Sequence, residues 1–119
     1  MNNTIDNAPN LHTIDLIKLP NAYVAEAAMA VQFSNCTALK NITFEGTLYY
    51  KVNLQWSPLS VESMKNIISC LCNYTDIPTT YEPILKFNDE CWAALEANST
   101  APDGNTWREY VQNTLCWNI

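Results

Sequence analysis

The clearest pattern in the chain is a strict alternation of apolar and polar positions between residues 42 and 56. The even positions are Ile42, Phe44, Gly46, Leu48, Tyr50, Val52, Leu54 and Trp56, and the odd positions between them are polar or amphipathic. A period of two indicates a β-strand with one buried face and one solvated face. A two-residue turn at Glu45-Gly46 would exchange the faces, so we predict one continuous strand with a bulge at Gly46. A three-residue loop at 45–47 also keeps the parity.

Two shorter strands are expected before this one. Four apolar residues within a short segment predict an edge strand over 13–19. Residues 22–34 are ambiguous, because their alanines favour a helix whereas the alternation that starts at Met29 favours a strand, and we choose a strand over 26–34. Residues 1–11 are polar and are expected to form a flexible N-terminal arm.

The second half of the chain has the spacing of helices. A first helix is predicted to begin at the Ser-Pro pair of residues 57–58 and to end before Asn73, since apolar residues recur in it every three or four positions. A second helix is predicted over 89–97, with Asn88 as its N-cap. A third helix starts with a Thr-x-x-Glu capping box and spans 106–116.

Strands followed by helices predict an α+β domain in two layers. Strands that bury only one face are typical of antiparallel sheets. We therefore expect a small antiparallel sheet of two to three strands, with one long strand near 42–56, packed on about three helices in the C-terminal half. A chain of 119 residues fits a single domain over 1–119. No internal repeat is visible in the sequence.

The charge distribution excludes two classes of partner. The chain carries a net charge of −6, and its 6 basic residues are scattered along the sequence. Binding to nucleic acid needs clustered cations, and so does binding to an anionic membrane surface. The longest apolar run covers residues 27–31, far short of the roughly 20 residues that span a bilayer. We therefore expect neither direct nucleic-acid binding nor a membrane segment.

No combination of residues predicts a catalytic or metal site. The 5 cysteines contain no C-x-x-C pair, and Cys70 and Cys72 would point about 200° apart on one helix. The single histidine, His12, is adjacent to no cysteine in the sequence, and a cysteine nucleophile needs such a base. Cys91 and Cys116 are expected to be buried small hydrophobic residues. We expect no enzyme, no cofactor and no metal.

Signals for the cellular compartment point in two directions. Five Asn-x-Ser/Thr triplets, at Asn2, Asn35, Asn41, Asn73 and Asn98, fit an extracellular glycoprotein with disulfides. In contrast, the chain begins with Met and lacks a basic and apolar leader, and an odd number of cysteines leaves at least one unpaired. We therefore predict a cytoplasmic protein, with an extracellular domain as the alternative.

By exclusion, these features predict a non-enzymatic protein-binding module. Its expected surface is the outer face of the long strand with one aromatic residue of the C-terminal tail: Glu45, Thr47, Tyr49, Lys51, Asn53 and Trp117. A small acidic inhibitor of a host enzyme, encoded by a phage or another mobile element, has this composition. Two alternatives are a secreted, N-glycosylated and partly disulfide-bonded ligand or receptor ectodomain, and a structural subunit that forms homo-oligomers, such as a homodimer, through its edge strand and N-terminal arm.

Overall fold

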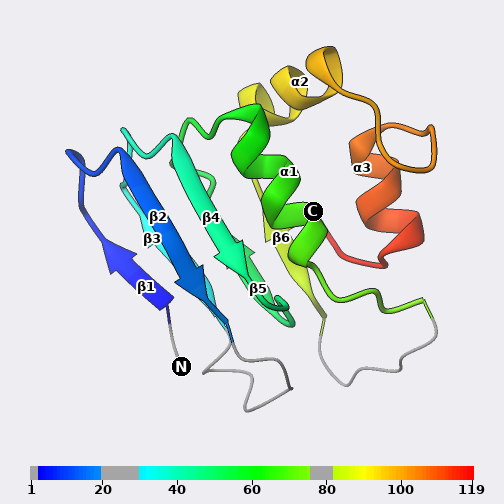
Figure 1. Cartoon of the computed structure of the whole chain (residues 1–119), viewed down its shortest axis with the longest axis horizontal. Helices are drawn as coiled ribbons and strands as arrows, with labels where there is room; N and C mark the ends of the chain where they lie inside the picture. Colours follow the sequence, from blue (N-terminus) through cyan, green and yellow to red (C-terminus); the bar gives the residue numbers. More distant parts are fainter. Residues whose placement is uncertain (1–2, 20–29, 76–81) are drawn as a thin grey trace.

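The computed structural model describes residues 3–19, 30–75 and 82–119, and two parallel sheets form its body (Figure 1). The first sheet contains, in spatial order, β1 (Asn3–Asp6), β3 (Val31–Ser34), β5 (Lys51–Asn53) and β6 (Ile84–Lys86). The second sheet contains β2 (Thr13–Lys18) and β4 (Asn41–Glu45). The second sheet lies in front of the first in Figure 1, and buried residues of both belong to one hydrophobic core.

The predicted antiparallel sheet is wrong, because every pair of strands in the described residues is parallel. The burial pattern nevertheless has the expected form, since β4 alternates between exposed and buried residues, with Ile42 and Phe44 facing the core. Each sheet covers one face of the other and leaves the opposite face more exposed. Two stacked parallel sheets therefore produce the same one-sided alternation as an antiparallel sheet.

The predicted continuous strand over 42–56 is also wrong. The chain leaves the second sheet at Gly46, whose φ is 112°, and enters the first sheet at β5. The parity survives this change of sheet, because Phe44 of β4 and Val52 of β5 both face the shared core. Alternation therefore reports which side chains face inward, and it does not report whether they belong to one sheet.

The chain moves between the two sheets in a regular coil. From β1 to β5, successive strands belong alternately to the first and the second sheet. Each new strand pairs with the strand that the chain added to the same sheet before it. Asn3 lies opposite Val31, an offset of 28 residues (31 − 3), and β2 and β4 begin with the same offset. We name residues 3–18 the first coil and residues 31–45 the second coil. A repeated coil of this kind is the unit of a solenoid.

The two coils share a turn as well as their strand positions. Asn7 and Asn35 occupy equivalent positions, and their φ angles are 60° and 56°. Asparagine adopts this left-handed backbone more readily than most residues, so the turn favours it in both coils. The repeat is hidden in the sequence because it consists of this turn and of apolar positions such as Leu11 and Leu39, without runs of identical residues.

The strands outside the long alternating segment match the sequence predictions unevenly. The predicted edge strand over 13–19 is confirmed as β2. The predicted strand over 26–34 is confirmed for β3, whereas residues 26–29 lie outside the described residues. Part of the segment expected as a flexible arm forms β1, which pairs with β3 along its length. The three-residue strand β6 was not predicted, because it is too short to show a period.

The three predicted helices are present within the described residues. They are α1 (Val61–Cys70), α2 (Asp89–Asn98) and α3 (Trp107–Glu109), which continues into the π-helical turn η2 (Tyr110–Thr114). The predicted N-caps of the last two are confirmed: Asn88 accepts the N–H of Cys91, and Thr106 accepts the N–H of Glu109. The reciprocal half of the predicted capping box differs, because the Glu109 carboxylate accepts the hydroxyl of Thr106 in place of a backbone N–H. The first helix starts later than predicted, because its N-cap is Ser60.

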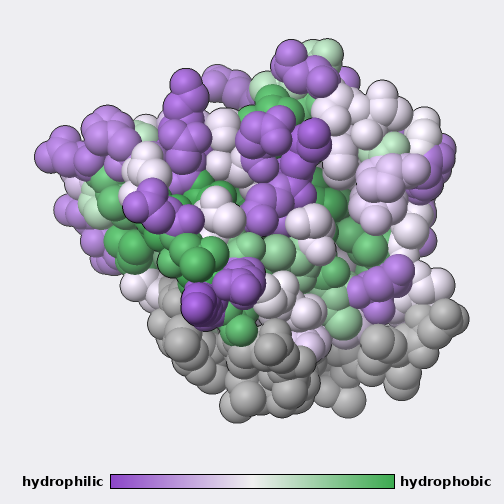
Figure 2. Space-filling view, viewed as in Figure 1, coloured by the Kyte–Doolittle hydropathy of each residue, from purple (hydrophilic) through white to green (hydrophobic). Residues whose placement is uncertain are grey.

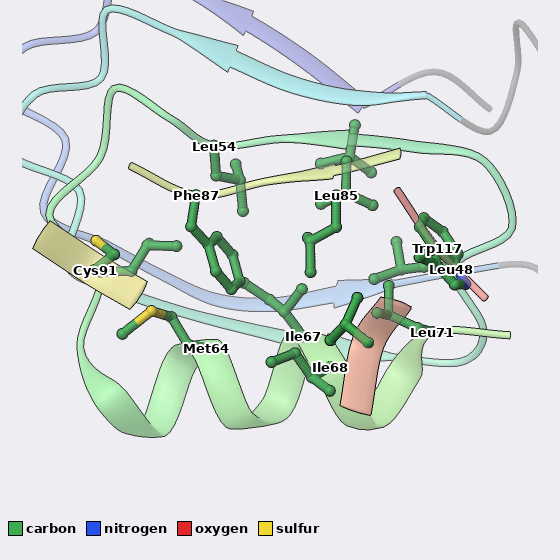
Figure 3. Packing of buried hydrophobic residues seen from close by; sticks show 14 of the residues in the cluster. Leu48, Leu54, Met64, Ile67, Ile68, Leu71, Leu85, Phe87, Cys91 and Trp117 are labelled. Atoms are coloured by element: carbon green, nitrogen blue, oxygen red, sulfur yellow. The ribbon is translucent and has the colours of Figure 1, made fainter. Parts of the chain in front are cut away.

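The helices close the core on the side away from the first coil (Figures 1 and 3). Ile67 and Ile68 of α1 lie on the side of the helix that faces Leu85 of β6, and Met64 lies beside Cys91 of α2, below Phe87 (Figure 3). No helix within the described ranges has the length and apolar character needed to cross a bilayer. Within residues 3–19, 30–75 and 82–119, the fold therefore has a helical end and an end formed by strands alone, and this difference positions the candidate site.

Candidate functional site

The residues predicted to bind a partner do not form one surface. Glu45 lies on the second sheet and Lys51 on the first, because the predicted strand is divided between the two sheets. Asn53 is buried, and its side-chain oxygen accepts a backbone hydrogen bond within the chain. Thr47 and Tyr49 are half-buried in the connection between the sheets. The geometry therefore separates a group of residues that the alternation had placed together.

Trp117, the aromatic residue of the predicted surface, belongs to the core. Its exposed fraction is 1%, and its Nε1 donates a hydrogen bond to the carbonyl of Cys72 at 2.8 Å. Its ring centre lies 6.0 Å from that of Tyr74. The C-terminal tail thus uses this side chain to attach itself to the body of the protein, and the ring is not accessible to a partner in this structure.

The five cysteines are free thiols in three different environments. Cys36 and Cys91 are buried, Cys70 and Cys72 are half-buried, and Cys116 is exposed. Burial raises the pKa of the Cys70, Cys72 and Cys91 thiols above the ordinary value, so less of each is thiolate at neutral pH. The expected burial of Cys116 is wrong, because this residue follows the last helical turn with a φ of 63°.

The described surface contains two open hollows with polar linings. One, of about 270 Å³, lies between the outer face of the second sheet and the start of α1. The other, of about 500 Å³, contains Lys86, Asp89 and Arg108, and the guanidinium of Arg108 lies 5.6 Å from the ring centre of Trp92. No group of three His, Cys, Asp or Glu side chains within residues 3–19, 30–75 and 82–119 could hold a metal ion.

The outer edge of β4 is covered by side chains of α1 that take the place of a neighbouring strand. The Ser63 hydroxyl accepts the N–H of Ile42 at 3.0 Å and donates to the carbonyl of Lys40 at 3.2 Å. The Asn66 amide accepts the N–H of Phe44 at 2.8 Å and donates to its carbonyl at 3.2 Å. These four backbone groups of the edge are therefore already paired and are not free to bind a further strand.

The outer edge of β6 is covered by the C-terminal tail. The N–H of Leu85 donates to the carbonyl of Asn118 at 2.8 Å, and the N–H of Asn118 donates to the carbonyl of Pro83 at 2.9 Å. Asn118 thus continues the sheet as a short parallel bridge beside β6. Both sheets consequently end in a covered edge at the helical end of the fold.

The opposite edge of the second sheet is different. Within the described residues this sheet ends at β2, which pairs with β4 alone. The strand contains a bulge between Ile14 and Ile17, and Leu16 within it has an exposed fraction of 47%. Figure 2 shows hydrophobic surface over the β1–β2 side of the molecule, next to polar side chains. We name the outer side of β2, residues Thr13–Lys18, the open edge.

Equivalent apolar positions of the two coils differ in burial. Ile42 and Phe44 in the second coil have exposed fractions of 2% and 3%. Ile14 and Ile17, which lie opposite them in the first coil, are only half-buried. The second coil is covered by the first coil on one side and by α1 on the other, whereas the described residues cover the first coil on one side only. Among the residues that the structure describes, the open edge is therefore the incompletely buried end of the two coils.

The sequence predicts the strand of the open edge, and it names this strand as a pairing site only in the alternative of a structural subunit. The signal that could have drawn attention to it is the spacing of Ile14 and Ile17, which breaks the alternation and indicates a bulge. The lack of cover on β2 depends on residues distant in sequence and has no local signal.

Comparison of the chain with protein-family models, with curated proteins and with solved structures finds no match. Its function therefore has to be inferred from the geometry of the chain itself.

Proposed function

We propose that the chain is a non-enzymatic protein-binding module that binds a strand of its partner at the open edge. The main support is the difference between the two edges of the second sheet. Side chains of α1 pair the backbone groups along β4, whereas the described residues place no further strand along β2. An uncovered edge strand offers its backbone N–H and C=O groups to another chain.

The side chains of the open edge suit the addition of a strand. Ile14 and Ile17 pack against the core and are only half-buried, so an added strand would extend the apolar layer over them. Thr13, Asp15 and Lys18 are exposed and would meet polar side chains of the partner. A partner strand with alternating apolar and polar residues fits both faces of this edge.

This proposal keeps the function expected from the sequence and moves its surface. The surface expected from the sequence depended on one continuous strand over 42–56, and two of its residues, Asn53 and Trp117, are buried. The open edge is instead formed by the predicted edge strand over 13–19. Binding through this strand is also the chemistry expected of a structural subunit that forms homo-oligomers, so the two functions share one surface.

Affinity capture with a matched pair of variants tests the proposal. Leu16→Lys places a charge on the exposed apolar position of the open edge, where a bound strand would desolvate it. Ala97→Lys adds the same side chain at an exposed position of α2 and is the control. We expect the tagged wild-type chain and A97K to retain the same bound proteins from the source cell, and L16K to lose them.

Hydrogen–deuterium exchange then locates the contact. In the captured complex, the amides of β2 are expected to exchange more slowly than in the free chain, while the amides of α2 exchange at an unchanged rate. Thermal melting of L16K and A97K establishes that both are folded. Equal capture by folded L16K and wild-type protein, or protection confined to another surface, would contradict the proposal.

A further inference from the structure

We infer that the partner of the open edge is a second copy of this chain, paired antiparallel with it about a two-fold axis. The inference rests on the proposed function, because it assigns an occupant to the same edge. It is carried by the residue order of β2, Thr-Ile-Asp-Leu-Ile-Lys, in which an acid and a base flank two apolar residues. A strand of this composition is complementary to its own reversed copy, and a two-fold axis brings identical surfaces together.

The bulge determines which side chains of β2 face inward. Ile14 and Ile17 lie opposite buried residues of β4, so both face the core although they are three positions apart. The register shifts between them, and the extra residue lies in the pair Asp15–Leu16. Lys18 lies opposite the exposed Glu45 and faces outward, and Asp15 is exposed beside the outer hollow of the second sheet. The acid and the base therefore lie on the same face.

One antiparallel register pairs the two outward charges of the strand with opposite charges of the second copy. If the two-fold axis passes between Leu16 and Ile17, Asp15 lies opposite Lys18 of the second copy, and Ile14 lies opposite Leu19 of that copy. Residues directly opposite each other in an antiparallel pair project to the same face. Leu19 packs against the core, as Ile14 does. In this register each outward charge meets an outward charge of opposite sign, the inward Ile14 meets the inward Leu19, and at the axis Ile17 meets Leu16, the exposed residue of the bulge.

The neighbouring registers each fail one of these conditions. A shift of one residue places the inward Ile14 opposite the outward Lys18. The register in which Ile14 lies opposite Ile17 keeps the faces matched, but it sets Asp15 opposite Leu16 and leaves the carboxylate without a cation. The charges therefore select a single register. Pairing also joins the two-stranded second sheets of both copies into one sheet, and a sheet of two strands is marginal by itself.

Charge-exchange variants test this register by analytical ultracentrifugation. The wild-type chain is expected to dimerise reversibly over about a hundredfold range of concentration. Asp15→Lys places two lysines opposite each other, twice in each dimer, and is expected to raise the dissociation constant at least about tenfold. Lys18→Asp is expected to have the same effect, because it places two acids opposite each other.

Recombining the two changes should restore the dimer. The double variant D15K/K18D again sets opposite charges against each other and is expected to dimerise as the wild-type chain does. An equimolar mixture of the two single variants should form mixed dimers, since one variant carries only bases at these positions and the other only acids. In a parallel pairing of like residues each position would meet its own copy, so each single variant would exchange one pair of like charges for another and change the dissociation constant little. Loss of the dimer in the single variants and its recovery in the double variant are therefore specific for the antiparallel register.

Glu82→Lys is the control, because it makes the same change of charge at an exposed position next to β6. Lys18 lies opposite Glu45 in its own chain, so Lys18→Asp could destabilise the monomer itself. Thermal melting therefore establishes that each variant is folded. If K18D is unfolded, the dissociation constant of D15K alone tests the register. A monomeric wild-type chain, or an unchanged dissociation constant for D15K, overturns the inference. If the wild-type chain is monomeric while L16K still loses its captured proteins, the proposed function stands with another partner.

Discussion

The side-chain amide of Asn66 makes the two hydrogen bonds to the backbone of Phe44 that a neighbouring strand would otherwise make. Its Oδ1 accepts the N–H of Phe44 at 2.8 Å, and its Nδ2 donates to the carbonyl of Phe44 at 3.2 Å. A residue on α1 thus ends the second sheet at β4 without a further strand. Helical cover of this kind protects a sheet edge from pairing with other chains.

Removal of this amide is expected to destabilise the fold. In Asn66→Ala the N–H of Phe44 loses its partner next to the core and the carbonyl of Phe44 keeps only the weak thiol donor of Cys70, which should lower the free energy of unfolding by about 1–3 kcal/mol. Urea denaturation measures the change. Lys65→Ala is the control on the same helix, because Lys65 forms an exposed ion pair with Glu62 at 3.8 Å, and its loss should cost less than about 0.5 kcal/mol. Equal effects of the two variants would show that the amide does not cover the edge.

Trp117 is expected to contribute to stability and not to partner binding. Trp117→Ala leaves a large cavity under the C-terminal tail and should lower the free energy of unfolding by about 3–5 kcal/mol. Trp117→Phe keeps an aromatic ring but loses the hydrogen bond to Cys72, so it should cost about 1 kcal/mol from that bond in addition to a smaller packing loss. A folded W117A protein of wild-type stability that fails to bind partners would instead support the surface expected from the sequence.

The two glycines are expected to respond differently to substitution. At Gly46, with a φ of 112°, an added Cβ would lie 2.8 Å from the carbonyl oxygen of Leu19, so Gly46→Ala combines backbone strain with a clash and should cost more than about 2 kcal/mol. At Gly104, with a φ of 83°, the Cβ would meet no atom within 4 Å, and Gly104→Ala should cost about 1 kcal/mol from strain alone. Thermal or urea unfolding of both variants measures the difference between their losses of unfolding free energy. If the chain did not change sheets at Gly46, the two losses would be equal.

Alkylation of the folded protein at neutral pH should label Cys116 first. Cys36 and Cys91 are buried and should react only on unfolding. Labelling of Cys70 and Cys72 should accelerate as the pH rises above the range of an ordinary thiol, because burial raises their pKa and the thiolate is the reactive form.

Mass spectrometry after labelling without reductant, in the folded and the denatured protein, counts the free thiols. Five labels in the denatured chain would argue against the secreted, disulfide-bonded alternative, and fewer would favour it.

The features that depend on neighbouring residues were predictable. The cap of α2 at Asn88 and the cap of α3 at Thr106 each involve an N–H three residues further along the chain, so the residue types alone indicate them. The inward positions of β4 follow from a period of two in the same way. The candidate site was predictable as an edge strand that could pair with another subunit, whereas its exposure depends on the arrangement of the other strands and of α1.

The sequence by itself determined where two of the helices begin and which side chains of β4 face the core, since capping and alternation act over a few residues. Only the tertiary structure decided that the strands are parallel, that the segment over 42–56 is divided between two sheets at Gly46, and that β2 is left as the open edge. The physical reason is that a strand's neighbour is chosen by hydrogen bonds to residues far along the chain, such as those between β1 and β3. Inward and outward alternation is identical for every such choice, so the pattern of apolar residues determines burial and leaves the pairing to the assembled fold.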